Sequence, residues 1–215
     1  MPASAQDSVR GSFKAATGCF LELAAAVPDA SWDAPGIGVW TIRDLVGHAS
    51  RALGTLEAYL DKAGEGAPLE GPAAYFLAVG ADPPGSEGRA ARDLAIAGRG
   101  REAGIALGAR PGVAVGELAR RVLALVDASP DRARVATPAG PMTLITYLPT
   151  RTFELTIHSL DLARATHQAP PATLAPAIAA SVVLAGQVAA VHPLAARVLE
   201  ALCGRSALPE GFTVV

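Results

Sequence analysis

Apolar residues recur at intervals of three and four along most of the chain, which is the period of an amphipathic helix. The pattern predicts long helices over residues 6–27, 41–62, 86–107, 115–128, 144–166 (or 146–166) and 173–190, and shorter ones over 74–81 and 193–202. Residues 134–144 instead carry a Pro/Gly turn between two short extended segments, which is typical of a small hairpin. The pattern therefore predicts an all-α fold with one minor extended element.

The helix over residues 41–62 has the clearest start signal. Thr41 can cap its amino terminus, and Asp44, three residues later, can return the hydrogen bond as a capping box. Trp40, just before the cap, can pack on Leu45 and fix the angle at which the chain enters the helix.

The segment 169–190 is the longest uncharged, mostly apolar stretch in the chain. It contains three prolines, a glycine and a glutamine, which disfavour a membrane-spanning helix. We therefore expect a buried helix and no membrane partner.

Composition excludes several classes of function. The 215 residues carry a formal net charge of −2 and a pI near 6.1, which provide no basic surface for nucleic acid. Two distant cysteines, Cys19 and Cys203, do not indicate a disulfide framework. The amino terminus has no basic region followed by a long apolar run, so we expect no signal peptide and a cytoplasmic protein.

Polar residues form a narrow stripe on the otherwise apolar helix over 144–166. Arg151, Glu154, His158 and Asp161 are spaced i, i+3, i+7 and i+10, so they share one face. Ionisable groups are costly to bury unless they pair or bind something. Glu154 and His158 can point at one common ion, although an exposed face with ordinary i,i+4 pairs would have the same spacing.

A second pair with this spacing, Asp44 and His48, lies on the helix over 41–62. A lone histidine in such a helix is more often a core residue with a satisfied hydrogen bond than a metal ligand. Asp44 has two roles available, as the helix cap or as the acceptor of an imidazole N–H from His48.

Three motifs together resemble one known family. They are Trp40-Thr-Ile-Arg-Asp-Leu-Val-Gly-His48, Arg151-x-x-Glu154-x-x-x-His158-x-x-Asp161, and the ending Gly204-Arg205…Leu208-Pro-Glu-Gly-Phe212. The chain resembles the mycothiol-dependent maleylpyruvate isomerase family, within the DinB-like superfamily of metal-binding four-helix bundles. The resemblance implies an up-down-down-up bundle over residues 1–168, with the hairpin before its last helix, and a small helical extension and tail over 169–215.

The resemblance also implies a metal site. In the family, one histidine and a Glu-x-x-x-His pair hold a divalent metal, usually zinc, and the matching residues are His48, Glu154 and His158. Two imidazoles and one carboxylate leave a fourth position open, which is the pattern of a catalytic zinc site. Asp161 and Asp44 could orient the histidines, and Arg151 could either neutralise Glu154 or face an anionic substrate.

By resemblance, the open position would take the sulfur of a low-molecular-weight thiol, which is mycothiol in the best-known branch. The thiol would then serve isomerisation of a double bond or transfer to an electrophile. A thiol-independent metal hydrolase with Asp44 or Asp161 as general base, and a non-catalytic metal-binding or regulatory bundle, are the alternatives. The spacing does not separate a monomer from a homodimer.

Four arginines on the helix over 86–107 are further candidates. We expect them to form a solvated face, with a role in holding an anionic substrate as the alternative; they are Arg89, Arg92, Arg99 and Arg101.

Overall fold

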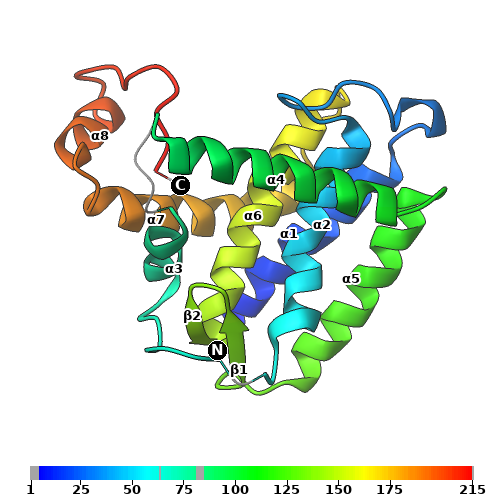
Figure 1. Ribbon diagram of the computed structural model, residues 1–215, viewed down its shortest axis with the longest axis horizontal. Helices are drawn as coiled ribbons and strands as arrows, with labels where there is room; N and C mark the ends of the chain where they lie inside the picture. Colours follow the sequence, from blue (N-terminus) through cyan, green and yellow to red (C-terminus); the bar gives the residue numbers. More distant parts are fainter. Residues whose placement is uncertain (1–4, 63, 81–84, 215) are drawn as a thin grey trace.

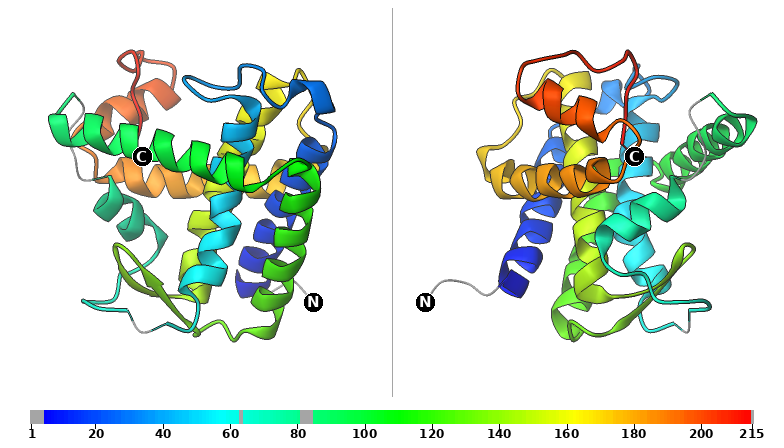
Figure 2. Two further views of the ribbon diagram at one scale, coloured as in Figure 1. Left: turned by 45° about the vertical axis from the view of Figure 1, so that its right-hand side comes forward. Right: turned by 90° about the vertical axis from the view of Figure 1, so that its left-hand side faces the viewer.

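Four helices form the body of the molecule, two running in one direction and two in the opposite direction (Figures 1 and 2). The structure is a computed structural model that describes residues 5–62, 64–80 and 85–214, with side chains from Ser8 onward. The bundle helices are α1 (Ala5–Ala25), α2 (Ile42–Tyr59), α5 (Pro111–Ala128) and α6 (Leu144–Ala165). α1 and α6 run in one direction and α2 and α5 in the other, which confirms the up-down-down-up, all-α prediction.

The predicted hairpin comes immediately before α6. Its strands, β1 (Arg134–Thr137) and β2 (Gly140–Thr143), pair antiparallel with Thr137 opposite Gly140. A bridge between Leu60 and Val135 ties the hairpin to the end of α2. α2 therefore ends at Tyr59, three residues earlier than predicted, because the chain turns there to pair with β1.

Local capping signals set the helix starts. Thr41 and Asp44 form the predicted capping box at the start of α2. α5 begins at Pro111, four residues before the predicted start, because a proline is well accommodated at the first helical position. α6 begins at Leu144, which puts Pro149 in its second turn, where the ring removes one backbone hydrogen bond.

Two further helices lie across the bundle. α4 (Glu87–Ala106) crosses α2 at a close contact between Gly47 and Gly104, where a Cβ added to Gly47 would lie 2.2 Å from the Gly104 nitrogen. α3 (Pro72–Val79) contacts α6 and α7. The predicted end of this helix at residue 81 and the loop over 82–84 lie outside the described residues.

The carboxyl-terminal part consists of η2 (Ala172–Leu174), α7 (Ala175–Ala190) and α8 (Ala195–Leu202). α7 packs against α1, α3 and α6 through one face, so the predicted buried helix is buried on that side only. Residues 172–190 are long and apolar enough to cross a membrane by length and composition alone. In the most apolar stretch of this segment, 33% is buried inside the protein.

Two smaller differences from the pattern occur. A single 3-10 turn, η1 (Asp29–Ser31), interrupts the predicted loop between α1 and α2. The end of the chain, whose apolar residues would suit an extended strand, belongs to no strand in its described residues, 212–214.

Two groups of buried side chains make up the core. The larger fills the centre of the bundle and includes Phe13, Phe20 and Tyr147, each fully buried. The smaller joins α3, α6 and α7 through Phe76, Phe153, Leu184 and Val188.

Candidate metal centre

Three side chains from two helices meet beside the crossing of α2 and α4. α6 presents Glu154 and His158 one turn apart, and α2 presents His48 opposite them. One possible ligand atom from each lies within 4.8 Å of the other two. The Nε2 atom of His158 is 3.5 Å from Oε2 of Glu154, and the two imidazole rings meet edge to face with centroids 4.8 Å apart.

This group fits a divalent metal ion. Ligand bonds of about 2.1 Å in a tetrahedral site would place the ligand atoms about 3.4 Å apart, close to the observed His158–Glu154 separation. In addition, Nδ1 of His48 is buried without a hydrogen-bond partner among the described residues. An orphaned buried imidazole nitrogen is costly, and a metal ion would be a suitable partner. The donor set of two imidazoles and a carboxylate suits zinc and several related ions.

Asp161 orients His158 from behind. Its Oδ2 lies 3.3 Å from Nδ1 of the imidazole, so Nε2 is left to face Glu154. Burial alone would lower the pKa of His158, but hydrogen bonds to Asp161 and Glu154 outweigh it and raise that pKa to about 9. Without a metal, His158 is therefore protonated and pairs with both carboxylates, and a metal ion would displace its proton.

Glu154 is correspondingly held as a carboxylate. Burial would raise its pKa, but the hydrogen bond to His158, the charge of Arg151 and the positive charge of His158 lower it to about 2. An ionised carboxylate is the form that binds metal.

His48 is kept neutral, which also favours metal binding. Burial is the largest cause that lowers the pKa of His48, and the positive charge of His158 is the next. Glu154 raises this pKa, but Arg51 and Arg99 lower it further, so it falls to about 4. Trp40 stacks on the ring at 4.5 Å between centroids and itself donates from Nε1 to the Ala97 carbonyl of α4. The indole therefore fixes the plane of the imidazole.

Asp44 could cap α2 or accept a hydrogen bond from His48, and in the structure it caps the helix. Its carboxylate accepts from the Thr41 backbone N–H at 3.1 Å, and its own N–H donates to the Thr41 hydroxyl. In the part of the chain that the structure describes, no hydrogen bond joins Asp44 to His48.

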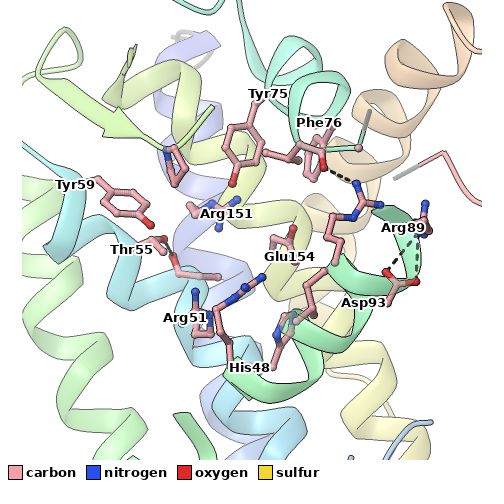
Figure 3. Close-up of a pocket in the computed structure, with 17 residues that line it drawn as sticks. His48, Arg51, Thr55, Tyr59, Tyr75, Phe76, Arg89, Asp93, Arg151 and Glu154 are labelled. Atoms are coloured by element: carbon pink, nitrogen blue, oxygen red, sulfur yellow. Dashed lines mark hydrogen bonds and ion pairs between the residues drawn. The ribbon is translucent and has the colours of Figure 1, made fainter. Parts of the chain in front are cut away.

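A cavity of about 600 Å³ adjoins the ligand group (Figure 3). His48 and Glu154 lie in its wall, so the group is open to a small molecule on this side. α3 contributes Tyr75, Phe76 and Val79 to the wall, and α4 contributes Ile96 together with charged side chains. Its charged side chains are five arginines and two acids: Arg51, Arg89, Arg92, Arg99, Arg151, Asp93 and Glu154.

A smaller cavity of about 310 Å³ borders the same group at His158. Trp40, His158 and Asp161 line it together with residues 37–39. Ile96 and Asp93 of α4 border both cavities. The candidate ligands therefore border two cavities.

The arginines of α4 are partly solvated, as predicted, but most of them also line the larger cavity. Arg89 and Arg92, which are half-buried, and Arg99, which is exposed, line the larger cavity, whereas Arg101 is exposed outside it. Arg89 pairs with Asp93 within the helix at 3.4 Å. Three of the four thus face a site where an anion could bind.

Several cavity residues were not identified from the sequence. Arg51, Thr55 and Tyr59 follow the predicted ligand His48 on α2 at i+3, i+7 and i+11, and all line the cavity. This stripe has the same period as the one on α6, so it could have been found. Tyr75 could not, because only the packing of α3 on the bundle brings it to the cavity.

Most of the sequence matches a known family. Residues 13–163 match the family described as the mycothiol maleylpyruvate isomerase N-terminal domain. The chain belongs to this family. No curated protein and no solved structure matched the chain in the corresponding comparisons.

Membership of the mycothiol maleylpyruvate isomerase family confirms the resemblance, and the match covers the first two of the three motifs but not the third, over residues 204–212. The matched range includes all three candidate ligands, together with Arg151 and Asp161. It ends before α7, so the family match does not extend to the carboxyl-terminal helices.

Proposed function

We propose that this protein is a divalent-metal-dependent enzyme that activates a low-molecular-weight thiol for isomerisation of an electrophile or for transfer to it. The observation that carries the proposal is that His48, Glu154 and His158 converge at the wall of an open cavity of about 600 Å³. The family match supports mycothiol as the thiol, and the ligand types support zinc as the metal.

The metal ion would lower the pKa of a thiol, so that thiolate is present at neutral pH. The chain supplies the rest of the site. Asp161 holds His158 with its Nε2 toward Glu154, and Trp40 holds the plane of His48. The cavity gives the two small molecules a common space in which the sulfur can reach the electrophilic carbon.

The two alternatives have less support. A thiol-independent hydrolase needs a general base, yet Asp44 caps α2 and Asp161 is engaged with His158 and Arg164. A non-catalytic metal-binding bundle would be favoured by a sealed ligand group, whereas this group borders two cavities.

The proposed partners are a thiol and an electrophile rather than a macromolecule. The net charge of −2 supports the absence of nucleic acid. Cys19 and Cys203 are both free thiols, which is consistent with a reducing compartment such as the cytoplasm.

The test is thiol-dependent turnover by the zinc-loaded protein. Purified protein is mixed with mycothiol and with electrophiles that carry an activated double bond or a leaving group, and product is followed with and without thiol. We expect turnover only with thiol, and its loss in Glu154→Gln. Glu102→Gln, on the exposed side of α4, is the matched control and should leave turnover unchanged. Turnover that is equal with and without thiol would overturn the proposal in favour of hydrolysis.

A further inference from the structure

Arg151 is a buried arginine in the wall of the larger cavity. Only 6% of the residue is exposed. Its Nε donates to the Thr150 hydroxyl at 3.0 Å, whereas its Nη2 is buried and has no hydrogen-bond partner among the described residues. A buried guanidinium nitrogen without an acceptor destabilises the fold, so its presence requires an explanation.

Two tyrosine rings hold this guanidinium group in place. Its Cζ lies 4.7 Å from the ring centroid of Tyr147 and 5.3 Å from that of Tyr75. Burial would lower the pKa of Arg151, but Tyr147, Tyr75 and Glu154 outweigh it and raise that pKa, so the group remains charged. A permanent charge held between aromatic faces is a preorganised receptor for an anion.

Neutralisation of Glu154 does not account for the unpartnered nitrogen. Arg151 helps to lower the pKa of Glu154 through its charge. Among the described residues, however, no hydrogen bond or ion pair joins the two side chains. An acceptor from outside the chain would satisfy Nη2.

The surrounding charges favour such an acceptor. Arg51 and the arginines of α4 lie around the same cavity (Figure 3), where Asp93 and Glu154 are the acids. Arg89 is offset by Asp93, so the wall retains an excess of positive charge. A cavity lined by one sign of charge raises the local concentration of oppositely charged ligands.

We propose that Arg151 is the docking point for an anionic oxygen, of a carboxylate or a phosphate, on the electrophile that reacts with the thiol. This proposal rests on the proposed function and names the class of its substrate, a small organic anion. Arg151 and Glu154 lie one turn apart on α6, at about 5–6 Å between Cβ atoms. An anionic end at Arg151 would therefore place the reactive carbon next to the metal ligands.

The test is the binding of small anions to the zinc-loaded protein in the absence of thiol. Calorimetry with succinate, inorganic phosphate and neutral succinamide measures affinity without any turnover. We expect succinate or phosphate to bind and succinamide not to bind, and the preferred anion identifies the group that Arg151 receives. Because no thiol is present, failure of the thiol chemistry would leave this result unchanged, so the two proposals can fail separately.

Two variants and one control localise the anion. Arg151→Met should weaken anion binding about tenfold to hundredfold, because a hydrogen bond to a charged group is lost. Arg151→Lys keeps the positive charge but loses the forked donors of the guanidinium group, so its anion affinity should lie between those of Arg151→Met and the wild type. Arg101→Met, on the exposed part of α4 outside the cavity, should bind as the wild type does.

Three results would overturn the proposal. The first is equal affinity in the wild type and both Arg151 variants. The second is equal binding of succinate and succinamide by the wild type. The third is complete loss of anion binding when zinc is removed from the wild type, since the anion would then sit on the metal. The last two need no variant, so they decide the question even if substitution of Arg151 prevents folding.

Discussion

At the scale of the residue, opposite pKa shifts prepare the candidate ligands for a metal. His48 is neutral because burial and nearby positive charges lower its pKa to about 4. Glu154 is ionised, with a pKa of about 2. His158 alone carries a proton that a metal must displace, because Asp161 and Glu154 raise its pKa to about 9 against burial.

Metal affinity should therefore depend on pH through His158. Below pH 9 the metal-free protein holds a proton there, so the affinity for zinc should rise about tenfold per pH unit and level off above pH 9. Competition titrations against a chelator at several pH values measure this slope. Asp161→Asn removes a carboxylate that raises the pKa of His158, so its plateau should begin at lower pH. A zinc affinity that does not change between pH 6.5 and 9 would contradict this assignment.

At the scale of the element, the crossing of α2 and α4 brings the arginine-bearing helix against the ligand group. Gly47 precedes His48, and the backbone of α4 at Gly104 occupies the place that a Cβ on Gly47 would take. A contact this close is possible only between glycines. It positions Arg92 and Arg99 beside the cavity and lets α4 accept the Trp40 hydrogen bond.

Gly47→Ala should therefore destabilise the fold. The added methyl group would lie 2.2 Å from the Gly104 nitrogen, so α4 must shift, at a cost of about 2–3 kcal/mol in the free energy of unfolding. Gly54→Ala, on the same helix with nothing within 4 Å, is the matched control and should stabilise by up to about 1 kcal/mol through helix propensity. Urea denaturation of both variants measures the difference. Equal stability of the two would show that the helices do not cross as described.

Helix periodicity predicts the elements well because each bundle helix buries a regular apolar stripe. It also brings Glu154 and His158 together, since both lie on α6. What periodicity does not predict is the packing between helices. The stacking of Trp40 on His48 and the position of Tyr75 over Arg151 depend on contacts between distant segments. Periodicity also places the start of α5 at Val115 rather than Pro111, because the first turn of this helix, which opens with a proline, carries no apolar repeat.

At the scale of the whole molecule, the carboxyl-terminal helices are joined to the bundle by a small apolar cluster. Leu184 and Val188 of α7 pack on Phe76 of α3 and Phe153 of α6. This contact holds α3, which bears Tyr75, next to the cavity. The predicted boundary between residues 168 and 169 remains a prediction, and the cluster provides a way to test it.

Leu184→Ala should destabilise the molecule as one unit. Truncating this buried side chain should cost about 2–4 kcal/mol. Val183, the residue before Leu184, is 63% exposed, so Val183→Ala is the control and should change the free energy of unfolding by less than about 0.5 kcal/mol. Thermal unfolding followed by circular dichroism should show a single transition at lower temperature for Leu184→Ala. A second, separate transition would show instead that residues 169–215 unfold independently.

The most direct test of the metal centre is the metal content of the purified protein. We expect about one zinc ion per chain in the wild type after zinc is supplied, measured by inductively coupled plasma mass spectrometry. His48→Ala, Glu154→Ala and His158→Ala should each lose it, whereas His192→Ala, an exposed histidine after α7, should keep it. A wild-type protein that remains metal-free, or ligand variants that bind as much zinc as the wild type, would contradict the central claim that these three residues hold a metal.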